Sequence, residues 1–549
     1  MTDWNFADVW ELAARIRGDR RALVHGGRRV SWTQFDRRAA GLASRFVAAG
    51  LERDAKVAQY LYNCNEYLES LFAAFKVSMV PVNTNYRYGA DELTYLWDNA
   101  DVEAVVFHEG FLPLAKEVRP RVPRVRLWLC AAESASGELA IELPDWAEPY
   151  EPAATSLGER SSTHLESPGG RSGDDLYLLY TGGTTGMPKG VMWRQDDLFV
   201  LLNGGSPVPM PDDAGLEGIT SFLEALNESP PSVLPACPLM HGTGAFTAFS
   251  SLILGGAVVT LTGRGFDPVA LLDLAEQEKV NLITIVGDAF AKPILRALDA
   301  APGRWDLSNL VGMISSGVIW SEETKRGLLR HNPNMTLVDA FSSSEALGMG
   351  SSISTAGAAA GTARFSLGEH AKVIDEEGRE IPPGSGRAGR LALGGRLPLG
   401  YYKDEEKTAA TFVVIDGQRY SVPGDYAVVE PDGSLQLLGR GSVSINTGGE
   451  KVFPEEVEEA LKTYPGVRDA AVVGVPDERF GQAITALVQL APGVQASPGE
   501  LIEHVKAHLA GFKAPRHLLF VESVGRSPAG KVDYETLTAT ARSRLGLPS

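Results

Sequence analysis

Cysteine is scarce in this sequence, which has only three among its 549 residues: Cys64, Cys130 and Cys237. Their spacing contains neither a CxxC pair nor another metal-binding pattern, which argues against a disulfide scaffold and a cysteine-based zinc site. A cysteine-poor chain with an excess of acidic residues is typical of a reducing compartment. We therefore expect the protein to act in the cytoplasm.

Basic residues are also in deficit, because 51 lysines and arginines stand against 69 aspartates and glutamates, a formal net charge of -18. Nucleic acid is therefore not an expected partner, since binding its phosphates needs an excess of basic side chains. The one basic cluster, between Arg119 and Arg126, alternates with valine and proline. We expect an exposed strand edge there.

Long hydrophobic runs are missing. The N-terminus has early acidic residues and no apolar stretch, so no secretory signal is predicted. The most apolar window, residues 245–261, is short for a membrane span and is interrupted by Gly255 and Gly256. We expect a buried helix followed by a buried strand there and no transmembrane segment, while peripheral membrane contact stays open.

Two common catalytic loops are absent as well: there is no G-x-S-x-G elbow of a serine hydrolase and no Walker A loop. The nearest sequence is TGGTTGMPKG, residues 181–190, in which two residues separate Gly186 from Lys189. Its glycines would still let backbone N–H groups approach an anion, and its threonines and lysine would add donors and charge. The stretch predicts a phosphate-binding loop, with a flexible turn as the alternative.

Short apolar runs alternate with amphipathic helical patterns over most of the chain, which indicates an α/β fold with largely parallel strands. The phosphate loop, Ser315–Gly317 and Ser342–Glu345 each follow such a run, at the strand ends where ligands gather. At this length, two or more domains are expected.

The pattern changes near residue 440. A hairpin with a PDG turn precedes it, and a compact α+β module of about one hundred residues follows. We expect a large N-terminal domain of several subdomains with mixed sheets, residues 1–440, and a small mobile C-terminal domain, residues 441–549. The glycine-rich stretch GRGSVSINTGGEK between them is a candidate hinge.

Six motifs in a fixed order resemble the adenylate-forming superfamily, which includes acyl-CoA synthetases, firefly luciferase and the adenylation domains of peptide synthetases. They are YTGGTTGMPKG from Tyr180, SSSE at Ser342–Glu345, Gly424–Asp425, LGR at Leu438–Arg440, GGEK at Gly448–Lys451 and PAGK at Pro528–Lys531. The resemblance covers nearly the whole chain. It implies a reaction in two steps: a carboxylate attacks the α-phosphate of ATP to give an acyl-adenylate and pyrophosphate, and a thiol, most often that of coenzyme A, then displaces AMP.

The resemblance also implies a role for each motif. The loop would hold the β- and γ-phosphates of ATP through Thr181, Gly182, Gly183, Thr184, Thr185, Gly186 and Lys189. Glu345, with Thr181, would bind Mg²⁺, a hard cation that prefers oxygen ligands and substrate phosphates. Phe341 would lie beside adenine and Ser344 at a phosphate, while Asp425 and Arg440 would bind the ribose. Ser316, Gly317 and Asp339 would complete the nucleotide site, and Gly448 and Gly449 would contact CoA.

Lys531 is the expected catalytic residue, together with Glu345. The family places this lysine at the α-phosphate and the substrate carboxylate, which repel one another, so that a cation between them would orient the attack and stabilise its charge. A solvated lysine in a surface turn is the alternative. Ser442 departs from the Asp or Lys that is common at the family's hinge, so the pivot residue is left open.

The expected substrate is a bulky apolar carboxylic acid, either a medium- or long-chain fatty acid or a sterol side-chain acid of the actinobacterial type. His241 and Gly317 are the candidate acyl-site residues, and no acid near His241 could pair with an amino-acid ammonium. Residues 203–233 are expected to form a flexible lid. Trp193 and Trp320 are candidates for closing the pocket.

Several alternatives stay open. The chain could load a carrier-protein thiol instead of CoA, act as a luciferase-like oxygenase, or bind ATP without catalysis. The expected partners are the small molecules ATP, CoA and the acid; the oligomeric state, with a dimer among the options, and the exact acid are not determined by the sequence.

Overall fold

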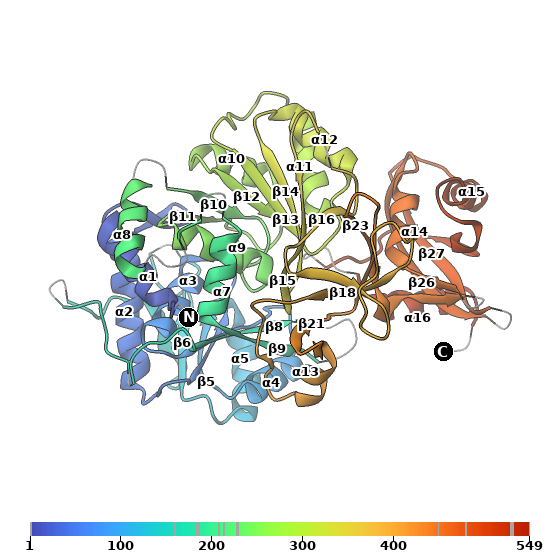
Figure 1. Ribbon diagram of the computed structural model, residues 1–549. Coiled ribbons are helices and arrows are strands. Elements are labelled where there is room, and N and C mark those ends of the chain that lie inside the picture. Colours follow the sequence, from blue (N-terminus) through green and yellow to red (C-terminus); the bar gives the residue numbers. More distant parts are fainter. Residues whose placement is uncertain are drawn as a thin grey trace. The chain divides into compact units, whose positions relative to one another are not determined.

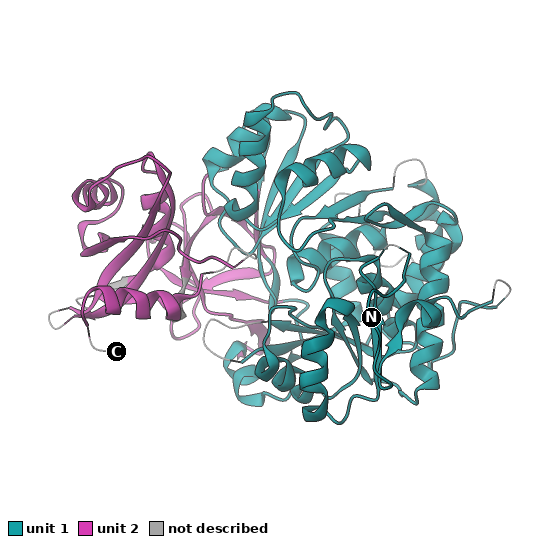
Figure 2. Cartoon of the chain, turned by 180° about the vertical axis from the view of Figure 1, so that it is seen from behind, with its two compact units in different colours: residues 1–348, 353–360, 395–412 teal, residues 349–352, 361–394, 413–549 magenta. Residues whose placement is uncertain are grey.

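The computed structural model describes residues 3–547 except 135, 159–160, 168, 182–186, 207–208, 212–214, 227–229, 359, 448–449, 478–479 and 528–531. The chain forms two compact units, which Figure 2 distinguishes by colour. The first comprises residues 1–348, 353–360 and 395–412, and the second residues 349–352, 361–394 and 413–549. The chain thus enters the second unit before residue 440.

The first unit contains two mainly parallel sheets, as expected (Figure 1). The first runs in the order β2 (Arg28–Ser31), β1 (Arg21–His25), β11 (Ala257–Thr260), β10 (Ser232–Pro235), β12 (Leu282–Ile285), β13 (Gly312–Ser316) and β14 (Thr336–Ser343). The second runs in the order β19 (Gly400–Tyr401), β9 (Lys189–Arg194), β8 (Leu176–Thr181), β4 (Val80–Asn83), β3 (Lys56–Tyr60), β5 (Val102–His108), β6 (Leu127–Ala131) and β7 (Glu148–Pro149). Neighbours are parallel from β1 to β14 and from β8 to β7.

Helices cover both faces of each sheet. Successive side chains of a strand point to opposite faces, so the packing partners of two neighbouring residues identify the helices on each face. In β1, Leu23 packs with a first group of helices: α1 (Phe6–Arg17), α2 (Trp32–Ala48), α3 (Asn65–Lys76) and α9 (Gly242–Ile253). Its neighbour Val24 packs with a second group on the opposite face: α10 (Pro268–Gln277), α11 (Asp288–Ala300) and α12 (Glu322–His331). In β3, Val57 packs with the first group and Ala58 with α4 (Ala90–Asn99) and α5 (Leu112–Val118). The first unit therefore has five layers, with helices between the two sheets and outside each.

The second unit contains an antiparallel sheet and a smaller sheet near the C-terminus. The antiparallel strands are β16 (Arg364–Leu367), β23 (Ser434–Arg440), β22 (Asp425–Val429), β18 (Gly389–Leu393), β21 (Gln418–Ser421) and β20 (Phe412–Ile415), with β17 (Ala371–Ile374) beside β18. The smaller sheet consists of β25 (Glu450–Val452), β24 (Ile445–Thr447), β27 (Gly481–Leu490) and β26 (Val467–Asp477), with β28 (His517–Phe520) beside β27.

Three helices cover this smaller sheet (Figure 1). In β26, Val472 packs with α14 (Pro454–Lys462) and α15 (Pro498–His508), and its neighbour Val473 packs with α16 (Tyr534–Arg544). Ser497 and Glu500 form the capping box predicted for α15. These elements confirm the expected small α+β module, and the fold class as a whole is confirmed.

Two local predictions need correction. Between Arg119 and Arg126 the arginines are exposed, but residues 119–121 form a single 3-10 turn and the strand begins only at Leu127. Pro120 and Pro123 lack the N–H group that a strand ladder needs. The segment expected to be a flexible lid, residues 203–233, contains a packed helix, α8 (Gly215–Ala225). Its side chains Ile219 and Leu223 are buried in the same core as α1.

The apolar window is confirmed as a buried helix followed by a buried strand, α9 and β11. Within the described part of the chain, no helix combines the length and the apolar character needed to cross a bilayer.

Candidate functional site

The predicted phosphate loop joins two antiparallel strands. Thr181, the last residue of β8, pairs with Lys189, the first residue of β9. The buried amide of Asn83 fixes this end of β8, because it donates to Tyr180 O (2.8 Å) and to Met240 O (2.6 Å) and accepts from Tyr180 N–H. Gly182, Gly183, Thr184, Thr185 and Gly186 lie outside the described residues.

Two aromatic side chains hold the turn that carries Glu345, between β14 and β15 (Ala346–Ser354). Trp193 Nε1 of β9 donates to Ser344 O at 3.0 Å, and Tyr401 Oη of β19 donates to Glu345 Oε1 at 2.8 Å. Lys189 Nζ lies 5.1 Å from the centre of the Tyr401 ring. The structure thus brings Lys189 to the ring of Tyr401 and Glu345 to its hydroxyl.

The residues expected around adenine lie on two adjacent parallel strands. Ser315 pairs with Asp339, and Ser316 pairs with Ala340, which precedes Phe341. Gly317 has φ 94°, and a Cβ at this glycine would come within 4.0 Å of Thr243 Oγ1, near the start of α9. The nucleotide and acyl candidates Gly317 and His241 therefore lie at the same edge of the sheet.

Asp339 is already paired. It is 4% exposed, and Lys325 Nζ of α12 lies 3.2 Å from its Oδ2. Burial raises the pKa of Asp339 to about 6, although the ammonium of Lys325 opposes the rise. Its carboxylate therefore has a structural partner in addition to any nucleotide.

His241 precedes α9 as its N-cap residue, and its side chain makes no capping hydrogen bond. The ring is half-buried. Trp193 and Trp320 are both fully buried in the first unit. The indole of Trp193 is hydrogen-bonded to the turn that carries Glu345. Trp320 packs in the core beside α11 and α12.

Asp425 and Arg440 face each other in the second unit as the first residue of β22 and the last of β23. Asp425 is buried, at 6% exposure. Gly448, Gly449 and Lys531 lie outside the described residues, as do the side chains of Arg440 and Ser442. The structure thus provides the backbone pairing of the expected ribose site, but not the placement of the expected catalytic lysine.

Sequence reasoning missed Asn83, Tyr401 and the role of the Trp193 indole as a hydrogen-bond donor. Asn83 ends an apolar strand, and a lone polar residue there is the only signal it offers. Tyr401 lies in a strand of two residues, which is too short to show a period.

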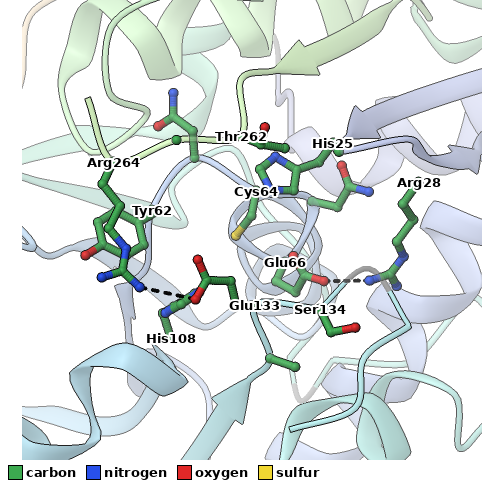
Figure 3. A pocket seen from close by; sticks show the side chains of 15 residues that line it. His25, Arg28, Tyr62, Cys64, Glu66, His108, Glu133, Ser134, Thr262 and Arg264 are labelled. Atoms are coloured by element: carbon green, nitrogen blue, oxygen red, sulfur yellow. Dashed lines mark hydrogen bonds and ion pairs between the residues drawn. The ribbon is translucent and has the colours of Figure 1, made fainter. Parts of the chain in front are cut away.

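A separate cavity of about 260 Å³ opens in the first unit, at the carboxyl ends of β1, β3, β5, β6 and β11 (Figure 3). None of the expected site residues lines it. Figure 3 shows Arg28 turned to Glu66 and Arg264 turned to Glu133, at 2.7 and 3.2 Å. Each of these charges is thus balanced by a neighbour.

Both histidines of this cavity are hydrogen-bonded through Nδ1. His25 Nδ1 lies 2.9 Å from Thr260 Oγ1, and this hydroxyl also lies within hydrogen-bonding distance of Val24 O. His108 Nδ1 accepts from Gly110 N–H, so its hydrogen is on Nε2. Burial lowers the pKa of His25 to about 4 and also lowers that of His108.

Comparison with protein families decides the assignment of the chain. The family described as "AMP-binding enzyme" matches residues 10–402, and the "AMP-binding enzyme C-terminal domain" matches residues 456–531. The chain belongs to the AMP-binding enzyme family. The expected membership of the adenylate-forming superfamily is thereby confirmed.

Curated relatives of this AMP-binding enzyme match along nearly its full length. It is 40% identical over 539 residues, 96% of this chain and 95% of the relative, to a "Medium/long-chain-fatty-acid--CoA/3-oxocholest-4-en-26-oate--CoA ligase" of Mycolicibacterium smegmatis. It is 40% identical over 541 residues, 96% and 94% of the two chains, to a "3-oxocholest-4-en-26-oate--CoA ligase" of Rhodococcus rhodochrous. The "Medium-chain acyl-CoA ligase Mig" of Mycobacterium avium is 39% identical, with 96% of each chain covered.

Solved structures share the fold. An anthranilate CoA ligase in complex with anthranoyl-AMP superposes with a TM-score of 0.81 at 20% identity, covering 99% of this chain and 98% of the other. ATP-bound MatB from Rhodopseudomonas palustris gives 0.78 at 23% identity, with coverages of 98% and 99%. At such low identity the likeness establishes the fold alone.

Proposed function

We propose that this AMP-binding enzyme is an ATP-dependent acyl-CoA ligase for bulky apolar carboxylic acids. The observation that carries the proposal is the match along 96% of the chain to ligases named for fatty and sterol side-chain acids. The substrate is accordingly a medium- or long-chain fatty acid, or an acid with a sterol skeleton. We place the reaction in the cytoplasm.

In the first step, the acid attacks the α-phosphate of ATP. The loop from Thr181 to Lys189 holds the departing β- and γ-phosphates, with the lysine ammonium as the cation. Phe341, Ser316, Gly317 and Asp339 border the adenine, and Ser344 lies at a phosphate. Asp425 and Arg440 bind the ribose hydroxyls, for which their cross-strand pairing is suited.

The residues near Glu345 fit Mg²⁺. Mg²⁺ is commonly held by one or two carboxylates and substrate phosphates rather than by a cage of protein ligands. Glu345 offers one half-buried carboxylate beside the strand pair that carries Thr181 and Lys189. Bound there, the cation would neutralise the charge of the phosphates. In the described ranges no three His, Cys, Asp or Glu side chains are grouped as ligands of one metal ion.

Lys531 acts on the same step from the C-terminal domain. In the proposed reaction its ammonium would reduce the repulsion between the attacking carboxylate and the α-phosphate and stabilise the charge that develops. In the second step, residues 441–549 turn about the stretch near Ser442. Gly448 and Gly449 then contact CoA, whose thiolate displaces AMP from the acyl group, and His241 borders that group.

A panel of carboxylic acids tests the proposal. AMP release and thioester formation are measured with ATP, Mg²⁺ and CoA, from acetate through medium- and long-chain fatty acids to 3-oxocholest-4-en-26-oate. We expect the highest kcat/KM for a long-chain or sterol acid. Acetate as the best substrate would overturn the assignment, and AMP release without thioester would instead indicate another acceptor, such as a carrier-protein thiol.

A further inference from the structure

Tyr401 occupies a central place in the proposed site, although it lies some two hundred residues from the phosphate loop and over fifty from Glu345. Its hydroxyl donates to Glu345 Oε1 at 2.8 Å, and its ring is 5.1 Å from Lys189 Nζ. The side chain is 5% exposed, so water has little access to this hydrogen bond. Charge-assisted hydrogen bonds of this kind are stronger and more directional than neutral ones.

The backbone of Tyr401 is fixed from two sides. In β19 it pairs with Val191 of β9, and the next residue, Tyr402, donates its N–H to Gly190 O at 2.8 Å. On the other side, Tyr401 N–H donates to Thr408 Oγ1 at 2.9 Å, and this hydroxyl donates to Asp404 O. These hydrogen bonds therefore fix the position of the Tyr401 ring relative to β9, the strand that begins at Lys189.

Gly400 makes this register possible. Its φ is 148°, and a Cβ there would lie 2.4 Å from Thr408 Cγ2. Thr408 can approach closely enough to accept from Tyr401 N–H because residue 400 has no side chain. The local sequence is thus specialised for holding Tyr401 in place.

The consequence for Glu345 concerns its two oxygens. Tyr401 engages Oε1, and within the part of the chain that the structure describes no hydrogen bond occupies Oε2. A glutamate side chain has three torsions, and ordering them opposes cation binding. A carboxylate already oriented by a buried hydroxyl loses less freedom when it takes up a ligand.

We propose that Tyr401 is a positioning residue for the metal-binding carboxylate of Glu345. Its hydroxyl orients Oε1 so that Oε2 is presented to the cation that accompanies ATP, while the ring keeps Lys189 beside the same phosphates. This inference rests on the proposed function, because it assumes that Glu345 binds Mg²⁺.

The substitution Tyr401→Phe removes only the hydroxyl. The matched control is Tyr402→Phe, whose hydroxyl donates to Asp101 Oδ2 at 2.9 Å instead of to Glu345. Calorimetric titration of each protein with ATP, with and without Mg²⁺, provides a readout that does not depend on turnover. For Tyr401→Phe we expect MgATP binding to weaken about tenfold, as for loss of a hydrogen bond to a charged group. Binding of metal-free ATP should change less than twofold, and Tyr402→Phe should match the wild type in both titrations.

The Mg²⁺ concentration for half-maximal AMP release should rise about tenfold in parallel. Equal weakening of ATP with and without Mg²⁺, or the same Mg²⁺ response in both tyrosine variants, would overturn the positioning role. Should Tyr401→Phe not fold, Thr408→Val serves in its place, since it removes the group that accepts from Tyr401 N–H; it should raise the half-maximal Mg²⁺ concentration more than twofold, and no rise would overturn the proposal.

These outcomes are distinct from failure of the proposed function. A wild-type protein that forms no acyl-adenylate with any acid would refute the ligase assignment itself. A wild type that is active, with a Tyr401→Phe variant whose Mg²⁺ dependence is unchanged, would refute only the role of Tyr401.

Discussion

Lys325 Nζ lies 3.2 Å from Asp339 Oδ2, and both side chains are almost completely enclosed between α12 and β14. A buried ion pair of this kind is costly to break, because the remaining charge has neither water nor a partner. We therefore expect Lys325→Met to lower the free energy of unfolding by about 3–5 kcal/mol at pH 7. Urea unfolding followed by circular dichroism measures this.

The double variant Lys325→Met/Asp339→Asn is the matched control, because it leaves no unpaired charge. It should recover most of the lost stability, whereas a double variant no more stable than the single one would show that packing of the lysine stem, not the charge, is what matters.

The same pair makes stability depend on pH. Burial raises the pKa of Asp339 from 3.8 to about 6, so between these values the folded state binds more protons than the unfolded state. The free energy of unfolding contributed by this group is therefore greatest below pH 4 and falls as the pH rises toward 6. Relative to the double variant, wild-type stability should decrease by about 2 kcal/mol from pH 4 to pH 7. A constant difference across this range would contradict the raised pKa.

Asn83 connects the phosphate loop to the segment before His241, through its bonds to Tyr180 and Met240. Asn83→Ala leaves three backbone groups without this partner in a site that is 3% exposed. We expect a loss of about 3 kcal/mol in the free energy of unfolding. We also expect kcat/KM for the best acid to fall at least tenfold at a temperature where the variant is folded, since small displacements of positioning groups reduce rates strongly.

Asn85→Ala is the control for Asn83. Asn85 lies two residues beyond the end of β4, and its side chain accepts from Arg87 N–H near the surface and is also hydrogen-bonded to the Tyr88 side chain. It should change stability by less than about 0.5 kcal/mol, as most surface substitutions do. Similar losses in both variants would mean that the strand end, rather than the Asn83 network, is sensitive.

Gly400→Ala should displace Tyr401, because its Cβ would collide with Thr408 at 2.4 Å. We expect the unfolding free energy to fall by about 1–3 kcal/mol, the usual cost of overpacking, and AMP release to require more Mg²⁺. Gly204→Ala is the comparison, since a Cβ at this glycine in α7 (Gln195–Gly204) meets no atom within 4 Å. A Gly400→Ala variant with normal Mg²⁺ dependence would show that the strand absorbs the clash without moving Tyr401.

Local signals in the sequence predicted much of this architecture. The parallel sheets follow from apolar runs between amphipathic helices, and helix α15 begins at the predicted capping box of Ser497 and Glu500. The sequence likewise predicted an apolar strand that ends just before the glycine-rich stretch, and β8 does end at Thr181; phosphate binding by that stretch stays a prediction.

Contacts between distant segments could not be predicted in this way. The pairing of Tyr401 with Val191 joins residues about two hundred positions apart, through a strand of two residues. The burial of Ile219 and Leu223 in the core that contains α1 could not be predicted either, since the glycines and prolines around α8 are typical of a loop. Local propensity does not record which distant surface covers an apolar side chain.

Substitution of Lys531 tests whether this lysine acts in adenylate formation and not in acyl transfer to CoA. If its ammonium stabilises the attack on the α-phosphate, Lys531→Ala should reduce acyl-adenylate formation at least a hundredfold, as removal of one electrostatic stabiliser typically does. Transfer of the acyl group from a supplied acyl-adenylate to CoA should be retained within about threefold, because the adenylate already contains the bond that the lysine helps to form. Pyrophosphate release measures the first reaction and thioester formation the second.

Lys506→Ala is the control, since Lys506 forms an exposed ion pair with Glu503 on α15 and its replacement should leave both rates unchanged. Equal loss of both half-reactions in Lys531→Ala would place the lysine in general substrate binding, and loss of neither would remove it from the catalytic site.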